Sequence, residues 1–254
     1  MDLPDPFYEL GHHFAIDLPG SRAAFSTRRG GHSTGPYQSL NLGWLTDDER
    51  RAVTRNRETL QAELGAPRLS FVHQVHGAEV RRITAGGGWE PSHRERVGGI
   101  RLDGQATDRT DVALCALTAD CLPIAVAGVG GDRSVAMLHA GWRGLATGII
   151  ASGVEAVREL GADGELSAAI GPGAGPCCYE AGEEVHEPFA DIGEAHVGRN
   201  LDLKAIARRQ LRAAGVTEVA DIGICTICSD PGLMFSHRRD HGVTGRQAGV
   251  AWLT

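Results

Sequence analysis

Three short apolar segments in the middle of the chain constrain its fold more than any other feature. They span residues 112–117, 122–127 and 135–138, and glycines flank them. Apolar runs of this length between turn residues are typical of strands in the centre of a sheet. The remaining elements must therefore be arranged around buried strands.

The other expected elements do not alternate regularly between strand and helix. Strands are expected at residues 21–26, 69–75, 79–84, 166–170 and 218–224, with a short one at the C-terminus. Helices are expected at residues 47–64, 144–160, 182–190 and 203–213. This order favours an α+β fold, a single domain with mixed β-sheets flanked by helices, over a doubly wound fold.

No break in composition marks a domain boundary within residues 21–254, which we expect to form one domain. Residues 1–20 are polar and Pro-rich, and we expect them to form an N-terminal extension that lies loosely on the surface. Residues 86–99 are Gly-rich and charged, which predicts a surface loop.

Local signals predict the ends of two helices. Thr46 and Glu49 form a capping box before the first helix, and Gly65 with Pro67 ends it. Asp202 is the expected N-cap of the helix at 203–213. Four arginines predict a solvated basic face on the first helix: Arg50, Arg51, Arg55 and Arg57.

The charge balance excludes one class of partner. The chain has 254 residues, with 25 Lys and Arg against 32 Asp and Glu, and a net charge of −7. Proteins that bind the phosphate backbone normally carry a basic surplus, so a nucleic-acid polymer is not expected as a partner. A nucleoside needs only a local site, and the acidic balance does not argue against it.

The interpretation of the cysteines depends on the cellular compartment in which we expect the protein. No apolar run is long enough to span a bilayer, and the first residues show no basic segment followed by an apolar one. We therefore expect no membrane association and a cytoplasmic protein. In that reducing environment the six cysteines are core residues, ligands or nucleophiles rather than disulfides.

Two histidines and one cysteine are the candidate metal ligands. His76, Cys121 and His139 each lie at a strand end beside Gly or Pro, where functional sites are usually built. Two His and one Cys leave a fourth position open, as in catalytic zinc sites. His73 is three residues before His76 and would point to the other face of a regular strand, so we favour His76, which Gly77 follows.

Other interpretations of these residues stay open. Each can be a hydrogen-bonded core residue without a ligand. A trigonal His2Cys set with a weak axial Met is also typical of copper electron-transfer sites, and Met137 lies two residues before His139. Chemistry with several coppers needs paired histidines, and no His-x-His sequence occurs in the chain.

The remaining cysteines receive no assigned chemistry. Cys225 and Cys228 form a C-x-x-C motif, but a zinc ribbon needs a second such pair. Cys177 and Cys178 are adjacent, which suggests poor chelation geometry. Cys115 lies within an apolar segment.

Arginines beside turn segments are candidates for binding phosphate, because the planar guanidinium contacts two oxygens at once. A surface salt bridge is the alternative for each. The glycines of residues 171–175 could bind an anion through backbone N–H groups, although no P-loop sequence is present. These arginines are Arg28, Arg143, Arg238 and Arg239.

Seven segments together resemble one family. They are Phe-Ser-Thr-Arg-Arg-Gly-Gly at 25–31, Ser-Leu-Asn-Leu-Gly at 39–43, Gln-Val-His-Gly at 74–77, Ala-Asp-Cys-Leu-Pro at 119–123, His-Ala-Gly-Trp-Arg-Gly at 139–144, Ile-Gly-Pro at 170–172 with Cys-Cys-Tyr-Glu at 177–180, and Phe-Ser-His-Arg-Arg-Asp at 235–240. Over residues 20–254 the chain resembles the YfiH-type proteins, described both as polyphenol oxidase or laccase-domain proteins and as purine nucleoside phosphorylases. The Gly-Ala-Gly-Pro sequence at 173–176 departs from the family, which often has a bulkier residue before the second glycine.

The resemblance implies a fold, an activity and a ligand set. The fold is a single YfiH-like α+β catalytic domain over residues 21–254. The activity is phosphorolysis of adenosine, inosine, guanosine and methylthioadenosine, with deamination of adenosine, so the partners are purine nucleosides and phosphate. The ligand set is a zinc ion held by His76, Cys121 and His139.

Further roles follow as hypotheses from this implied chemistry. Asp120 is a candidate acid or base, and Cys121 and Arg143 belong to the same catalytic group. Arg28 and Arg143 are expected to bind phosphate, and Asn41 to bind substrate. The alternatives are a copper-dependent polyphenol oxidase and a zinc-stabilised protein without activity. The sequence indicates neither the preferred purine nor the oligomeric state.

Overall fold

Two six-stranded sheets form the centre of the molecule in the computed structural model, which describes residues 2–84 and 101–254. The first sheet has the order β1 (Tyr8–Leu10), β2 (His13–Leu18), β3 (Ser21–Phe25), β14 (Gln247–Leu253), β7 (Val112–Thr118) and β4 (Arg68–Ser70). The second has the order β13 (Glu218–Asp221), β10 (Leu166–Ile170), β8 (Leu122–Gly128), β9 (Ser134–Ala140), β6 (Gly104–Thr107) and β5 (Val80–Ile83). The loop expected at 86–99 lies outside the described residues.

Both sheets are mixed, which confirms the predicted α+β class. The pairs β4–β7, β5–β6 and β10–β13 are parallel, and the other pairs within the two sheets are antiparallel. The three apolar segments are confirmed as the fully buried strands β7, β8 and β9. They do not share one sheet, because the chain crosses from the first sheet to the second between β7 and β8.

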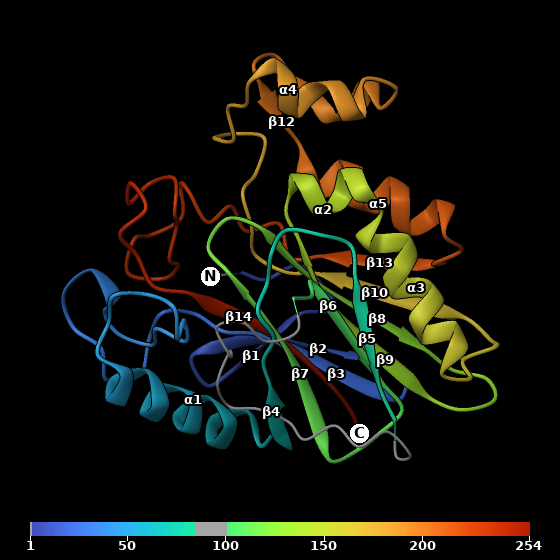
Figure 1. The fold of residues 1–254 in the computed structure, drawn as a ribbon, viewed down its shortest axis with the longest axis horizontal. Helices are drawn as coiled ribbons and strands as arrows, with labels where there is room; N and C mark the ends of the chain where they lie inside the picture. The colour runs from blue at the N-terminus through green and yellow to red at the C-terminus, as the bar shows by residue number, and fades with distance from the viewer. Residues whose placement is uncertain (1, 85–100) are drawn as a thin grey trace.

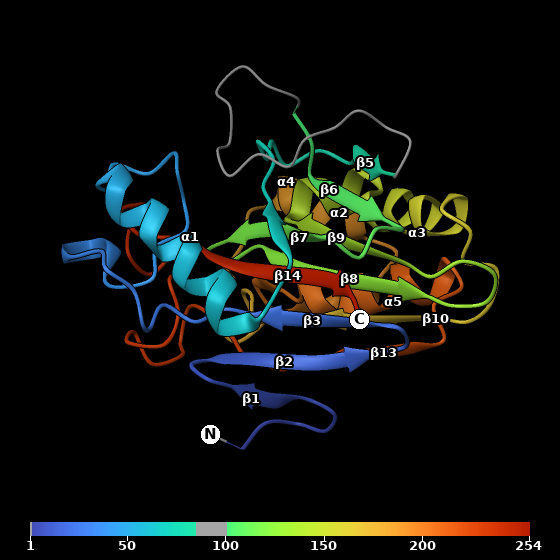
Figure 2. The ribbon, with the colours of Figure 1, turned by 90° about the horizontal axis from the view of Figure 1, so that it is seen from below.

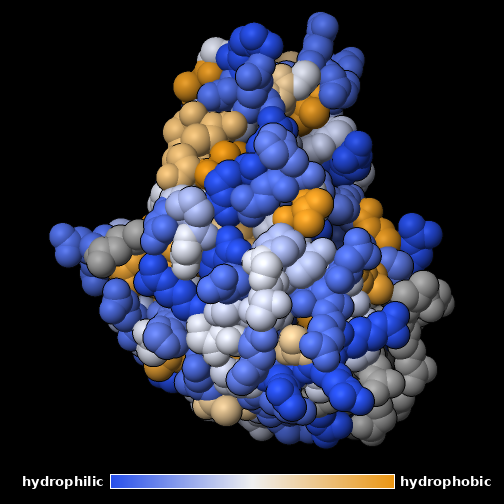
Figure 3. All heavy atoms as spheres, turned by 90° about the vertical axis from the view of Figure 1, so that its left-hand side faces the viewer, coloured by the Kyte–Doolittle hydropathy of each residue, from blue (hydrophilic) through white to orange (hydrophobic). Residues whose placement is uncertain are grey.

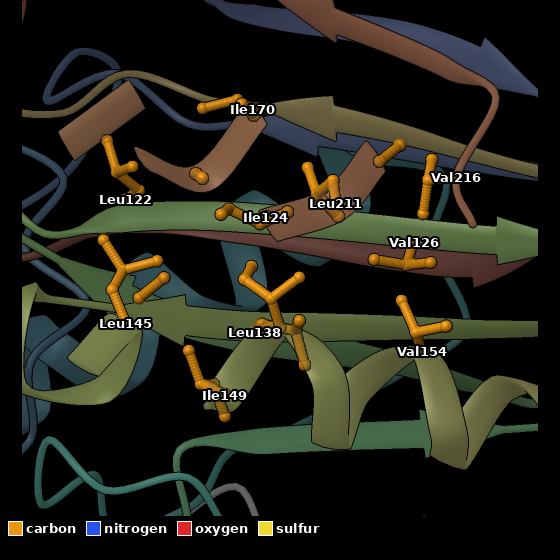
Figure 4. Packing of buried hydrophobic residues seen from close by; sticks show 14 of the residues in the cluster. Leu122, Ile124, Val126, Leu138, Leu145, Ile149, Val154, Ile170, Leu211 and Val216 are labelled. Carbon is orange, nitrogen blue, oxygen red and sulfur yellow. The ribbon is translucent and has the colours of Figure 1, made fainter. Parts of the chain in front are cut away.

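The sheets pack face to face, and helices cover their outer faces (Figures 1 and 2). Helices α2 (Trp142–Thr147), α3 (Ile149–Glu159) and α5 (Leu203–Ala213) cover the second sheet, and α1 (Arg50–Leu64) covers the first. Figure 4 shows the apolar layer between β8, β9 and the helices, where Ile124, Leu138 and Val154 pack together. Burial of such side chains contributes about 1.5–3 kcal/mol each.

Helix α1 differs from its prediction at the N-terminus. It begins at Arg50 rather than at residue 47, and no side chain caps it. Thr46 Oγ1 donates instead to the Gly43 carbonyl at 2.7 Å, so Thr46 belongs to the preceding loop. The predicted C-terminus is confirmed, because Gly65 has φ 58° in the left-handed region. The solvated face is wrong for Arg57, which is buried and stacks 3.8 Å from the Phe71 ring.

Other helices are shorter than expected. The helix predicted at 144–160 is two helices, because Gly148 between them has φ 94°. The helix predicted at 182–190 is a short α4 (Glu183–His186) followed by a 3-10 turn, Glu187–Phe189, which contains a proline. Helix α5 confirms its prediction, and the Asp202 carboxylate accepts the backbone N–H groups of Lys204 and Ala205.

The first twenty residues do not lie loosely on the surface. Strands β1 and β2 extend the first sheet, and Phe14 and Ile16 are buried between the two sheets. The expectation fails because the apolar residues of β2 pack on both faces of the sheet, which outweighs the polar, Pro-rich flanks. A division between an extension and a catalytic domain at residue 20 stays a prediction.

Several small elements complete the described residues. They are the hairpin β11 (His196–Val197) and β12 (Asn200–Leu201) and the 3-10 turns Gly35–Tyr37 and Gly193–Ala195. Among the described residues no helix is long and apolar enough to cross a membrane. The face in Figure 3 is mostly hydrophilic, with hydrophobic residues in separate small patches.

Candidate metal centre and active site

The three predicted metal ligands lie together although they come from different parts of the fold. His76 lies in the loop between β4 and β5, Cys121 lies in the crossover between β7 and β8, and His139 is near the end of β9. One ligand atom of each lies within 4.8 Å of those of the other two. The His76 and His139 rings meet edge to face, with their centroids 4.9 Å apart. The sequence motifs therefore converge on one point.

Asp103 orients two of these ligands. Its buried carboxylate accepts the His139 Nδ1–H at 2.8 Å and the backbone N–H groups of His76 at 2.8 Å and Gly77 at 2.7 Å. The bond at Nδ1 leaves Nε2 of His139 free to face a metal, which is the usual arrangement of a ligating histidine. The sequence interpretation missed Asp103. Its place directly before strand β6 carries no motif that would have marked it.

Two backbone features support the same arrangement. His76 has φ 62°, a conformation that non-glycine residues rarely adopt, and Asp103 holds the backbone there. At Gly141, a Cβ atom would lie 2.8 Å from Cys121 Sγ and 3.2 Å from His76 Cδ2. Only glycine therefore leaves room for the thiol and the imidazole to approach each other.

The electrostatics of the group favour an ionised thiol. Burial raises the pKa of Cys121, but His139 and His76 outweigh it and bring the pKa down to about 6. Burial lowers the pKa of His139, but the Cys121 thiolate and the Asp103 carboxylate raise it to about 9. Zinc binds cysteine as the thiolate and histidine as the neutral imidazole, so zinc would displace the proton that the raised pKa keeps on His139. The donor set, the Asp103 bond and the space at Gly141 thus fit a metal ion.

A cavity of about 430 Å³ opens beside this group, and His76 at its wall is exposed to solvent. This volume is within the range of small-molecule sites. The described residues that line it include all three candidate ligands and, among others, His73, Asp120, Trp142, Tyr179, Arg238 and Arg246.

Asp120 lies in the cavity wall, as its predicted role requires. It has φ 94° and is held by Thr226 Oγ1, which donates to one carboxylate oxygen at 2.7 Å, and by the Arg238 N–H, which donates to the other at 2.7 Å. The Ala174 N–H donates to its carbonyl oxygen, also at 2.7 Å. Asp120 therefore connects the crossover that carries Cys121 to two other loops.

The structure does not bring Arg28 and Asn41 to the cavity. The Arg28 guanidinium donates to the Pro231 carbonyl at 2.8 Å and stacks 4.2 Å from the Phe235 ring. Asn41 is fully buried, and its side-chain oxygen Oδ1 accepts the backbone N–H of Arg246 at 2.8 Å. Both side chains hold loops in place, a role that a list of polar residues in a motif does not reveal.

Arg143 lies near the cavity but is not among the described residues that line it. Its side chain is exposed and stacks 4.3 Å from the ring of Trp142, which is a lining residue. Two other arginines reach the cavity. Arg238 was a candidate from the sequence, whereas Arg246 was missed because it stands alone, before strand β14.

Arg238 and Arg246 both donate hydrogen bonds to backbone carbonyl groups. Arg238 stacks 5.0 Å from the Tyr179 ring and donates to the Glu180 carbonyl at 2.6 Å. Arg246 donates to the carbonyls of Thr244 and Gly245. Both guanidinium groups belong to residues that line the cavity, and a guanidinium can bind two oxygens of an anion at once.

The fold and this site define a class, an α+β protein of two stacked sheets with a His2Cys ligand group in a cavity wall. A family model described as multi-copper polyphenol oxidoreductase laccase matches residues 22–254. The chain belongs to this family, the YfiH family, and the resemblance seen in the sequence is confirmed.

Relatives with printed functions cover nearly the whole chain. A purine nucleoside phosphorylase of Pseudomonas aeruginosa is 40% identical over 91% of this chain and 93% of the relative. The purine nucleoside phosphorylase YlmD of Geobacillus stearothermophilus is 38% identical over 96% of both chains. These names support an enzyme of this class.

Solved structures show the same fold. The structure of YlmD from Geobacillus stearothermophilus matches with a TM-score of 0.84 and 34% identity, over 98% of this chain and 99% of that one. A protein of Bacillus licheniformis titled hypothetical protein YfiH matches with a TM-score of 0.88 and 29% identity, over 99% of this chain and all of that one.

Proposed function

We propose that this chain is a zinc-dependent purine nucleoside phosphorylase that also deaminates adenosine. The single observation that carries the proposal is the cavity, which has His76, Cys121 and His139 on one wall and Arg238 and Arg246 among its other lining residues. The names of the relatives support the phosphorylase class. The expected substrates are adenosine, inosine, guanosine and methylthioadenosine, together with phosphate.

The chain would hold zinc through Cys121 Sγ, His139 Nε2 and a ring nitrogen of His76. When bound there, zinc supplies a Lewis acid at the cavity wall. Asp103 keeps His139 in the tautomer that binds. Because all three residues line the cavity, a metal ion that they held would lie next to the space where substrate would bind.

The arginines to which we assign phosphate binding differ from those expected from the sequence. Arg238 and Arg246 line the cavity and replace Arg28, whose guanidinium is held by backbone carbonyls elsewhere. Arg143 stays a candidate at the rim, beside Trp142. Two guanidinium groups would fix the phosphate oxygens and orient the nucleophile toward the ribose.

Asp120 and the aromatic lining complete the proposed machinery. Asp120 is the candidate acid or base because it lines the cavity and directly precedes the ligand Cys121. It also fixes the backbone of Arg238 through the bond at 2.7 Å. Trp142 and Tyr179 give the cavity apolar surface on which a purine ring can stack. Asn41 acts by positioning Arg246 rather than by contact with substrate.

The test is an assay of zinc-loaded protein with inosine and phosphate. Hypoxanthine and ribose 1-phosphate should form only when phosphate is present, and Cys121→Ser should abolish their formation. The matched control is Cys115→Ser, a buried cysteine in the apolar cluster under α1. Unchanged inosine with zinc-loaded wild type would refute the phosphorylase. Adenosine incubated without phosphate tests deamination separately, because inosine is then the expected product.

A copper-dependent polyphenol oxidase is the alternative that the family description favours. One observation weakens it. Met137, the possible axial ligand, lies in the core between the sheets, where its sulfur is 2.9 Å from the position of a Cβ at Gly249. Oxidation of a phenol with oxygen uptake that rises with added copper, and no phosphorolysis, would establish the oxidase instead.

A further inference from the structure

A second group of potential ligands lies outside the cavity lining. Four cysteines come from two loops, Cys177 and Cys178 after β10, and Cys225 and Cys228 after β13. Strands β10 and β13 are parallel neighbours, so both loops leave the same edge of the second sheet (Figure 1). The four Sγ atoms lie within 4.8 Å of one another, and we call them the four-cysteine cluster.

The turn at residues 175–178 explains how adjacent cysteines can serve one site. The Cys178 N–H donates to the Gly175 carbonyl at 3.1 Å, and the Tyr179 N–H donates to the same oxygen at 3.0 Å. The chain is therefore bent rather than extended at Cys177 and Cys178. The expectation of poor chelation geometry is wrong, because the turn brings both sulfurs to the same side, 3.5 Å apart.

The distances between the sulfurs suit one metal ion. A zinc ion bound tetrahedrally by thiolates at about 2.3 Å places the sulfurs about 3.8 Å from one another. The sulfur of Cys177 lies 3.5 Å from that of Cys228, and all pairs lie within 4.8 Å. A cluster of several irons would hold its thiolates farther apart, because iron and sulfide atoms lie between them.

The backbone around Cys225 is arranged to stabilise a thiolate. The Gly175 N–H donates to Cys225 Sγ at 3.2 Å, and Gly173 pairs with Cys225 in a parallel bridge. Burial raises the pKa of Cys225, but the backbone N–H groups of Cys228, Gly175 and Ile227 outweigh it, so the pKa is lowered. A side chain at Gly175 would meet Cys225, with a Cβ only 3.1 Å from the Cys225 Cβ.

Two of the thiols, those of Cys177 and Cys178, have raised pKa values. Burial and the thiols of Cys228 and Cys225 raise the pKa of Cys178 to about 11, and burial and the neighbouring thiols also raise the pKa of Cys177. A divalent cation at the centre would reverse this repulsion, because it attracts every thiolate in the cluster. All six cysteines of the chain are free thiols in the structure.

We propose that the four-cysteine cluster binds one divalent metal ion of the zinc class as a closed, structural site, separate from the His2Cys group. Four protein ligands leave no open position for substrate, which is the pattern of structural zinc sites. This proposal does not depend on the phosphorylase activity. It assigns a role to four of the five cysteines that the sequence motifs left without one.

The ion would fasten two loops that form the cavity wall. Tyr179, which lines the cavity, directly follows Cys178. Thr226 lies between Cys225 and Cys228 and donates to the Asp120 carboxylate at 2.7 Å. Binding at the cluster would therefore hold Tyr179 and Asp120 in place without any contact between the ion and the substrate.

The first experiment counts metal ions per chain in protein purified under reducing conditions. Wild type should hold two zinc ions, Cys121→Ser one, Cys228→Ser one, and the double variant none. The control Cys115→Ala should keep both ions. Folded, reduced Cys121→Ser that takes up no zinc overturns the proposal.

The second experiment identifies the ligands and does not depend on how well Cys228→Ser folds. Cobalt added to Cys121→Ser, in which the four-cysteine cluster is intact, should give the absorption of a tetrahedral all-thiolate complex. Cys177→Ser in the same background should shift or remove it. A spectrum with nitrogen or oxygen ligands overturns the proposal, and so does a Cys177–Cys228 disulfide in protein kept under reductant.

Discussion

The His2Cys group and the four-cysteine cluster differ in the ligand atoms that they present to a metal ion and in their place in the fold. The first combines one thiol with two imidazoles, lies in a cavity wall and has an exposed histidine. The second consists of four thiols on two surface loops. We propose a catalytic role for the first and a structural role for the second.

The groups that hydrogen-bond to the ligands also differ between the two sites. A buried carboxylate, Asp103, orients the histidines of the first group. Backbone N–H groups support the sulfur of Cys225 in the second. Carboxylates suit imidazole N–H donors and amides suit thiolates, so each support matches its ligand type.

Cys121→Ser should have the largest effect of the changes considered. Removing the only thiolate of the first group should lower kcat/KM for inosine phosphorolysis by more than about a hundredfold, because loss of a partner that only supports a ligand already costs about 10–100-fold. Steady-state kinetics of the zinc-loaded proteins measure this. A loss of less than tenfold would separate the activity from the metal group.

Asp103→Asn should have the second largest effect, a loss of zinc affinity at the His2Cys group of about 10–100-fold. The amide cannot accept from the His139 Nδ1–H and from the backbone of His76 and Gly77 as the carboxylate does. Titration with a competing chelator measures the affinity. Metal held by the four-cysteine cluster should be unaffected, and loss of both ions would show that the variant is misfolded.

Gly141→Ala and Gly175→Ala form a matched pair, one for each group. The new Cβ would lie 2.8 Å from Cys121 Sγ in the first variant and 3.1 Å from the Cys225 Cβ in the second. Each should destabilise the fold by about 1–3 kcal/mol through overpacking. Metal analysis should show that each variant weakens only its own site, and a shared loss would contradict the separation.

Cys228→Ser should lower the melting temperature by several degrees, since structural metal binding contributes to folding. Its kcat/KM at low temperature should fall much less than that of Cys121→Ser. Thermal unfolding with and without chelator measures the effect. If chelator lowers the melting temperature of the variant as much as that of wild type, the cluster does not supply the stabilisation.

A substitution at His13 should have the smallest effect of the changes considered. His13 belongs to neither ligand group, so it also serves as a control. Its Nδ1 accepts the Thr27 N–H at 3.4 Å, which only the neutral ring can do, and its Nε2 donates to the Glu63 carboxylate at 2.8 Å. Burial lowers the pKa of His13, and nearby His12 acts in the same direction, while Glu63 opposes them.

The sign of the pH effect at His13 follows from this direction. A folded pKa below the unfolded one means that the unfolded state takes up the proton first as the pH falls, so stability is lost from about pH 7 downward. His13→Gln should flatten that slope in urea unfolding between pH 7 and 5. An unchanged slope would mean that other groups cause it.

The fold was predicted where apolar patterns are local. Strands β7, β8, β9 and β10 and helix α5 were predicted because their runs and caps lie within one segment. The break at Gly148 and the pairing of β2 were not, since they depend on a backbone conformation and on partners far away in the sequence. Strand β6 was missed because Gly-Gln-Ala-Thr has no apolar alternation.

The candidate site was predicted for its ligands and not for its surroundings. His76, Cys121 and His139 were found because these residue types are rare and stand in distinctive motifs. Asp103 and Arg246 could not be found, because common charged residues gain their role only from what the fold places beside them. The adjacent cysteines 177 and 178 were misjudged because the turn that bends them was not recognised.

Strand β14 (Gln247–Leu253) lies between β3 and β7, in the middle of the first sheet. A ribosome makes residues 247–253 after every other strand of that sheet, so the nascent chain must carry β3 and β7 without their common neighbour. Their edges stay open to other chains during that time. The first sheet is thus completed only after β14 has been made, and conditions that delay this step lengthen the interval in which the chain can aggregate.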